Sequence, residues 1–172
     1  MQKQSLPPSL QTPQSLDVLI LAAGLGTRMK SRLAKVLHKL GGRAVIAHVC
    51  RTAALLEPRR IYVIVGHQAD DVRAAVEDEL DKQRVDFVNQ TEQRGTGDAV
   101  MAARSALAGT NSTVLILSGD VPLVRAETLR ALIEKHLADK ASCTMLSVRL
   151  ENPSGYGRVV RDGSEDEIGG HD

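Results

Sequence analysis

Aromatic residues are almost absent from this chain. Its 172 residues include no Trp, one Phe and two Tyr, whereas proteins that bind single-stranded nucleic acid stack the bases on aromatic side chains. The net charge of +1 supplies no overall attraction to nucleic acid or to a membrane surface. We therefore expect neither of these as a partner, and we expect a core of Leu, Val, Ile and Ala.

Cysteine and long apolar runs are lacking as well. Cys50 and Cys143 stand far apart and form no C-x-x-C pair, so the sequence predicts neither a disulfide framework nor a zinc site. No apolar run approaches the roughly 20 residues of a membrane-spanning helix. Residues 1–16 are rich in Gln, Ser and Pro and lack the apolar segment of a signal peptide. We expect a disordered leader over 1–16, a flexible tail over 162–172 and a cytoplasmic location.

What the chain does contain is an alternation of short apolar runs and amphipathic stretches. The apolar runs predict strands at residues 18–23, 61–65, 85–88, 114–117 and 143–148. The amphipathic stretches predict helices at residues 44–56, 70–80, 96–107 and 125–137. This order indicates an α/β fold of three layers, in which helices cover both faces of a doubly wound, mostly parallel sheet. Ligands of such folds bind at the carboxyl ends of the strands.

The first predicted strand runs directly into Gly24 and Gly26, and a basic stretch follows. From Arg28 to Arg43 there are six Lys or Arg residues and no carboxylate. Glycines let backbone N–H groups approach anionic oxygens, and cations neutralise those oxygens, so this pattern favours a phosphate-binding loop. Met29 replaces a required glycine of both the dinucleotide fingerprint and the P-loop, which argues against both motifs. An ordinary turn with a solvated basic face stays open as the simpler interpretation.

Two cations and one carboxylate are the strongest candidates for chemistry. Arg28 suits a bidentate grip on terminal phosphates, and Lys35 suits a point charge at the phosphorus under attack. Lys39 is expected to be solvated. Asp120 follows the strand at 114–117 and is placed to hold Mg²⁺, which needs few protein ligands when a substrate supplies phosphates. The alternative for Asp120 is a turn aspartate before proline.

Gln90 and a glycine-rich turn follow the strand at 85–88. A glutamine amide offers both a donor and an acceptor, the pair needed to read one edge of a base. Gly95 would let backbone groups reach the same base. Thr96 is expected to cap the following helix. The alternative for Gln90 is a solvated loop residue.

Four segments combine these residues in a fixed order. They are LAAGLGTRMKS-x-LAKVLH-x-LGG from Leu21, QTEQRGTGDA over 90–99, GDVPL over 119–123 and GYGRV over 155–159. Together they resemble sugar-nucleotidyltransferases, and most closely the uridylyltransferase domain of N-acetylglucosamine-1-phosphate uridylyltransferases. The resemblance spans roughly residues 17–161, which we take as one nucleotidyltransferase domain. It implies a Rossmann-like nucleotide-diphospho-sugar transferase fold and Mg²⁺-dependent nucleotidyl transfer from UTP to a sugar-1-phosphate, with N-acetylglucosamine-1-phosphate as the expected acceptor.

The resemblance also implies roles for single residues. Arg28 would bind the leaving pyrophosphate, Lys35 the phosphate at the reaction centre, and Asp120 the Mg²⁺ ion. Gly157 would contact the amino-sugar, with Arg158 beside it. The residues implied to bind the nucleotide are Ala22, Ala23, Gly24, Gly26, Gln90, Gly95 and Thr96.

The chain departs from the family pattern at several positions. Ala34 and Ala44 stand where the family has proline, which frees the backbone locally but removes no functional group. Ser118 replaces a tyrosine on the sugar side. The family's second metal ligand and its acetyltransferase domain lie beyond residue 172, so we expect a truncated domain without acetyltransferase activity. Two alternatives stay open: a nucleotidyltransferase of the same fold with another base or acceptor, and a nucleotide-binding module without catalysis.

Overall fold

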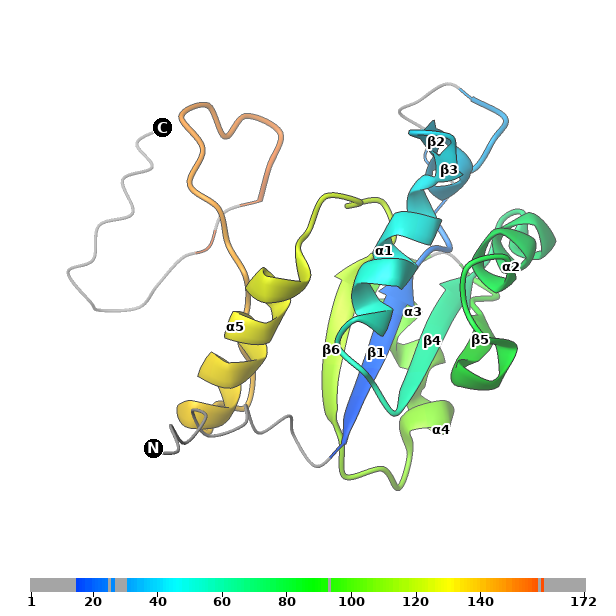
Figure 1. Ribbon diagram of the computed structural model, residues 1–172. Coiled ribbons are helices and arrows are strands. Elements are labelled where there is room, and N and C mark those ends of the chain that lie inside the picture. Colours follow the sequence, from blue (N-terminus) through cyan, green and yellow to red (C-terminus); the bar gives the residue numbers. More distant parts are fainter. Residues whose placement is uncertain (1–14, 25, 27–30, 93, 158, 160–172) are drawn as a thin grey trace, which may run out of the picture.

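The computed structural model describes residues 15–24, 26, 31–92, 94–157 and 159, and its centre is a four-stranded sheet (Figure 1). From one edge to the other the strands are β5 (Val85–Asn89), β4 (Arg60–Val65), β1 (Leu16–Leu21) and β6 (Thr113–Ser118). Every neighbouring pair is parallel. The predicted parallel sheet is therefore confirmed, with β1 and β4 as its central strands.

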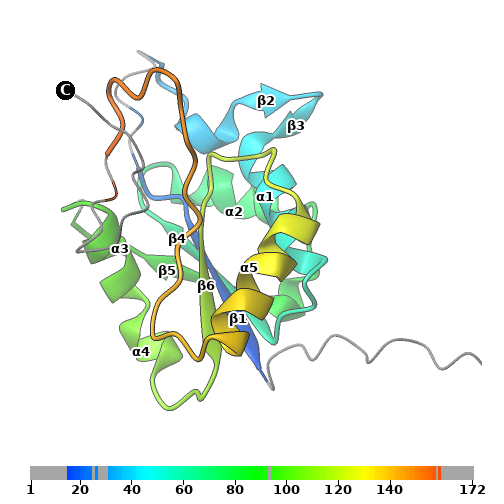
Figure 2. The same cartoon turned by 90° about the vertical axis from the view of Figure 1, so that its left-hand side faces the viewer.

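Helices cover both faces of this sheet and give the predicted three layers (Figure 2). On one face pack α1 (Val45–Ala54), α2 (Ala69–Glu77) and α5 (Ala126–Ala138). On the other face pack α3 (Thr96–Ala102) and α4 (Arg104–Leu107). Because β1 and β4 are covered on both sides, most of each strand is a continuous apolar run, at residues 18–21 and 61–65.

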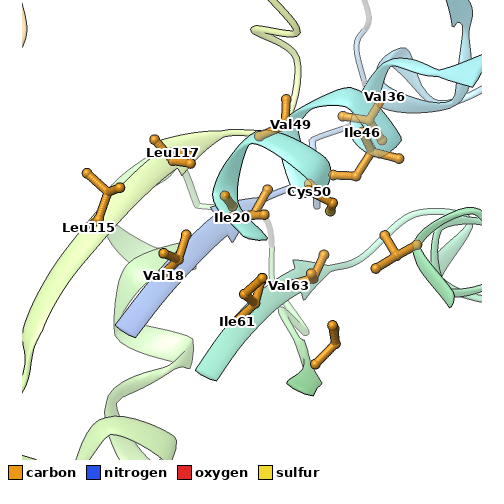
Figure 3. Close-up of a cluster of buried hydrophobic side chains, with 14 of the residues drawn as sticks. Val18, Ile20, Val36, Ile46, Val49, Cys50, Ile61, Val63, Leu115 and Leu117 are labelled. Atoms are coloured by element: carbon orange, nitrogen blue, oxygen red, sulfur yellow. The ribbon is translucent and has the colours of Figure 1, made fainter. Parts of the chain in front are cut away.

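The larger core lies between the sheet and α1, where side chains of β1, β4 and β6 point toward the helix (Figure 3). Val18 and Ile20 face α1, whereas Leu19 between them packs in the smaller core beside α3, as the alternation of a strand requires. Leu, Val, Ile and Ala supply nearly all of the buried apolar residues, as expected. Cys50 of α1 is fully buried there, and this burial, with a smaller contribution from Glu79, raises the pKa of its thiol to about 12.

A short hairpin and two 3-10 helices also belong to the described structure. β2 (Lys39–Leu40) and β3 (Arg43–Ala44) pair antiparallel. The two glycines between them have φ angles of 57° and 85°, which the tight turn of such a hairpin requires. The 3-10 helix η2 (Lys35–Leu37) leads to this hairpin, and η3 (Lys82–Arg84) leads into β5.

The predicted fifth strand at residues 143–148 is wrong. This segment belongs to no strand, and Met145, Leu146 and Val148 are exposed. An apolar sequence favours a strand only where a neighbouring strand offers hydrogen bonds and a surface to pack on. The segment contacts α5 instead, because the Thr144 hydroxyl lies 2.9 Å from Nδ1 of His136.

Three smaller predictions also differ from the structure. Leu16 is buried as the first residue of β1, one position before the expected start of the domain at residue 17; residues 1–14 and the tail at 162–172 lie outside the described residues. The helix expected at 96–107 is divided at Ala103 into α3 and α4. Thr96 does not cap α3, because Gly95 occupies the N-cap position.

The strand order places a switch point between β1 and β6. From β1 the chain adds β4 and then β5 on one side of the sheet, and it returns past β1 to add β6 on the other side. At such a reversal the loops leave the carboxyl ends of adjacent strands in opposite directions and open a crevice for a ligand. Among the described residues, no helix is long and apolar enough to cross a membrane.

Candidate active site

A cavity of about 490 Å³ opens at the carboxyl ends of the strands, beside this switch point. Its volume falls in the range of small-molecule sites. The segments that follow β1, β5 and β6 form its wall together with the beginnings of η2 and α3. The lining residues are Leu21, Ala22, Ala23, Gly24, Gly26, Lys35, Val36, Gln90, Gly95, Thr96, Ala99, Ser118 and Asp120.

Lys35 and Asp120 form an ion pair at the wall of this cavity. Nζ of Lys35 donates to Oδ2 of Asp120 over 2.5 Å, although the two residues are 85 positions apart in the sequence. The lysine side chain is 48% exposed and the carboxylate 31%, so both are accessible to a ligand. The cation and the carboxylate singled out in the sequence therefore lie in direct contact.

Gly119 fixes the position of Asp120 against the end of β1. Its N–H donates to the carbonyl oxygen of Leu21 over 2.9 Å. A Cβ at this position would lie 2.8 Å from that same oxygen and 2.9 Å from Cδ1 of Ile46. Only glycine lets the backbone beyond β6 approach β1 this closely, and this approach brings Asp120 to the loop that carries Lys35.

Lys35 is in turn positioned by two neighbours in the fold. The backbone N–H of the preceding Ala34 donates to Oε1 of Gln68 over 2.5 Å. Gln68 itself is in the left-handed conformation, with φ of 54°, at the N-terminus of α2. Gly26, with φ of 62°, packs so closely that a Cβ there would lie 2.9 Å from Cβ of Lys35. The catalytic candidate is thus held from the α2 side and from the glycine loop.

Gln90 reaches the cavity from the end of β5 and is buried, with 8% of its surface exposed. Its backbone N–H donates to the carbonyl of Val65 over 2.8 Å and extends the contact between β4 and β5. Its side-chain Nε2 donates to Oδ2 of Asp98 over 2.7 Å and to the carbonyl of Gly95 over a longer 3.4 Å. The side chain is therefore a fixed part of the cavity wall and not a solvated loop residue.

The residues present are compatible with Mg²⁺ bound together with a phosphate ligand, but not with a metal held by protein groups alone. No cluster of three or more His, Cys, Asp or Glu side chains suited to a metal occurs among the described residues. Asp120 is the one carboxylate among the described residues that line the cavity. One carboxylate suffices for Mg²⁺ when substrate phosphates and water complete the octahedron.

Most of the predicted site residues that the structure describes line this one cavity. Arg28 and Arg158 lie outside the described residues. Gly157 is described, but it is exposed and is not part of the cavity wall. Binding roles for all of these residues stay predictions.

Sequence reasoning missed several members of the site. Leu21, Val36 and Ala99 line the cavity as apolar residues of the elements that build it, and nothing distinguishes them locally from core residues. Asp98 lies behind Gln90 in the first turn of α3, where an acidic residue is expected to favour the helix N-terminus. This helix-start position explains the acidic residue without reference to Gln90, so nothing in the sequence identified Asp98 as its partner.

Comparison with known proteins identifies relatives of similar sequence. The family model of the MobA-like NTP transferase domain matches residues 18–162. The bifunctional protein GlmU of Solibacter usitatus is 52% identical over 151 residues, which cover 87% of this chain and 32% of that protein. GlmU of Corynebacterium diphtheriae is 44% identical over 156 residues, with 89% and 32% covered. The chain thus spans about a third of the length of these relatives.

Solved structures show the same fold at lower sequence identity. Rv0371c from Mycobacterium tuberculosis matches with a TM-score of 0.58 and 26% identity, covering 74% of this chain and 63% of that one. The UDP-glucose pyrophosphorylase from Acinetobacter baumannii matches with a TM-score of 0.61 and 19% identity, covering 74% and 54%. These neighbours support the Rossmann-like nucleotide-diphospho-sugar transferase fold.

Proposed function

The chain belongs to the MobA-like NTP transferase family and is a nucleotidyltransferase, and from this we propose that it transfers the uridylyl group of UTP to N-acetylglucosamine-1-phosphate. The products are a UDP-sugar and pyrophosphate. The proposed unit of function is the domain at residues 17–161. Relatives named GlmU at 44–52% identity support nucleotidyl transfer to a sugar phosphate.

One observation carries the proposal: a cation, a carboxylate and a fixed amide line the same cavity. Lys35 and Asp120 are paired at 2.5 Å, and Gln90 lies buried in the wall formed after β5. A nucleoside triphosphate requires these three functions, because its phosphates need neutralisation, its metal ion needs a ligand and its base needs a polar partner. Gly24 and Gly26 line the cavity between them and offer backbone N–H groups to the phosphates.

The chemistry needs no general base. The attacking oxygen of the sugar-1-phosphate is already an anion; it forms a bond to the α-phosphorus of UTP while the bond from that phosphorus to the pyrophosphate oxygen breaks in line. Catalysis then consists of positioning the two anions and stabilising the charge that develops between them. Lys35 supplies a positive charge at this centre, and Arg28 is proposed to bind the departing pyrophosphate.

The ion pair between Lys35 and Asp120 would open when the substrate binds. A phosphate oxygen replaces the carboxylate as the partner of Nζ, and the carboxylate becomes available to a cation. Mg²⁺ bound there would neutralise phosphate charge and polarise the phosphoryl oxygens. Within this arrangement the backbone of Ala22 and Ala23 and the turn at Gly95 and Thr96 bind the nucleoside. Gly157 is proposed to contact the amino-sugar.

A pyrophosphate-release assay with UTP, Mg²⁺ and N-acetylglucosamine-1-phosphate tests the proposal. Lys35→Met should lower the rate by about 10²–10³-fold, the effect of removing one group that stabilises developing charge. The matched control is Lys39→Met, because Lys39 is an exposed lysine on β2 outside the cavity wall. Equal rates in the two variants would refute the role of Lys35. Binding of UTP in a calorimetric titration without pyrophosphate release would identify a nucleotide-binding module without catalysis.

A further inference from the structure

The side chain of Gln90 has a defined orientation. A carboxylate without a proton can only accept hydrogen bonds, so the atom of the Gln90 amide that lies 2.7 Å from Oδ2 of Asp98 must be the nitrogen. The second N–H of the same nitrogen is directed at the carbonyl oxygen of Gly95 over 3.4 Å, and a carbonyl oxygen also only accepts. Reversing the amide would place oxygen against oxygen at both contacts.

This orientation leaves one atom of the amide for a ligand. Both donors of Nε2 are engaged by Asp98 and Gly95, and no described residue donates to Oε1 in the structure. Gln90 lines the cavity, whereas Asp98 does not. The cavity therefore presents an acceptor at this point, and Asp98 acts on it only through Gln90.

A fixed acceptor discriminates between pyrimidine bases. Uracil carries an N–H donor at N3, which can bond to Oε1. Cytosine carries a lone pair at N3, which would face Oε1 without a proton between them. The amino group of cytosine lies one position further along the base edge, so the base would have to shift relative to the backbone at Gly95 to reach the oxygen.

We propose that Asp98 is a positioning residue that fixes the amide of Gln90 with its oxygen toward the base and thereby makes the site prefer uracil to cytosine. The inference rests on the proposed function, since it concerns the nucleotide of that reaction. Without the carboxylate, only the longer contact with the carbonyl of Gly95 favours this orientation, so the amide of Gln90 can rotate and present its nitrogen as well as its oxygen. The preference between the two bases then falls, although every group that touches the nucleotide is still present.

The test is the ratio of the dissociation constants for CTP and UTP, measured by isothermal titration calorimetry at constant Mg²⁺. The variants are Asp98→Ala and Asp98→Asn; the asparagine is nearly the same size and can accept from or donate to the Gln90 amide. We expect this ratio to fall about tenfold in both variants. This is the effect of one hydrogen bond, between Gln90 and the base, whose direction is no longer fixed. The matched control is Asp71→Asn, which removes an exposed carboxylate from the first turn of α2 and should leave the ratio unchanged.

Each outcome separates this inference from the function on which it rests. A wild-type chain that binds neither nucleotide overturns both. A wild-type chain that prefers UTP, with the same preference in both Asp98 variants, overturns only the role of Asp98. A purely structural role of Asp98 would weaken both nucleotides equally and leave the ratio intact, and circular dichroism of each variant verifies that it is folded.

Discussion

Replacing Gly119 with alanine should destabilise the protein without touching any ionisable group. The added Cβ would lie 2.8 Å from the carbonyl oxygen of Leu21, 2.9 Å from Cδ1 of Ile46 and 3.4 Å from Cγ1 of Val36. Carbon atoms pack at about 3.5–4.0 Å, so the contact with Cδ1 of Ile46 is too short by more than half an ångström, and the contact with the oxygen lies below 3.0 Å as well. The oxygen cannot retreat easily, because it belongs to β1 and accepts the hydrogen bond from Gly119 itself.

The magnitude follows from what surrounds the new methyl group. Ile46 is fully buried in the larger core, so its side chain has no free space into which it can rotate. Overpacking of this kind costs about 1–3 kcal/mol, and we expect about 2 kcal/mol. For a chain of this length that loss lowers the melting temperature by about 4–8 °C. Urea denaturation followed by circular dichroism measures the free energy of unfolding directly.

Gly97→Ala is the matched control for this substitution. Gly97 lies in the first turn of α3, and a Cβ there would meet nothing within 4 Å. Because alanine has the higher helix propensity, this variant should be as stable as the wild type or more stable by up to about 1 kcal/mol. If Gly119→Ala were as stable as Gly97→Ala, the close approach of the loop after β6 to the end of β1 would be wrong.

Three further predictions concern groups described above. Because the pKa of Cys50 is raised from 9.0 to about 12 in the folded chain, its contribution to stability is complete below pH 9 and is lost as the pH rises toward 12, by up to about 1.4 kcal/mol per pH unit. Urea titrations between pH 8 and 11 should show the wild type losing this stability relative to Cys50→Ala. Arg59→Ala should lower the melting temperature, because it leaves the fully buried carboxylate of Asp17 without its partner at 2.5 Å; adding Asp17→Asn should restore part of the loss. Gly26→Ala should reduce pyrophosphate release, since its Cβ would press on Cβ of Lys35 and its φ of 62° costs an L-residue about 1–2 kcal/mol; an unchanged rate would show that the loop adapts.

Much of this fold could be predicted because its signals are local. The central strands are continuous apolar runs, and the helices between them carry apolar residues at helical spacing. The rule for the carboxyl ends of parallel strands then brought Lys35, Gln90 and Asp120 to one cavity, although they come from three separate loops. The predicted strand at 143–148 failed because strand formation depends on a partner, and the run of residues itself contains no information about one.

The contacts that orient the site were not predictable in the same way. The bond from Ala34 to Gln68 joins residues 34 positions apart, and no periodicity connects them. Gln68 is also in a left-handed conformation that its residue type does not suggest. An acidic residue such as Asp98 is common in the first turn of a helix. Only the geometry reveals that its carboxylate accepts a hydrogen bond from Gln90. Sequence patterns thus located polar groups that line the cavity but not the residues that hold them in position.

The bond between Ala34 and Gln68 has an evolutionary consequence. The family pattern has proline at the position of Ala34, and proline has no N–H to donate. In a relative with proline, the ring itself restrains the backbone before the lysine. An amide oxygen at position 68 would then have no backbone N–H from which to accept a hydrogen bond. A relative with alanine gives up that stiffness and needs an acceptor to replace it. The two positions should therefore change together among related sequences. Where the proline at position 34 is replaced, position 68 should carry a side chain that can accept a hydrogen bond from the backbone N–H of residue 34.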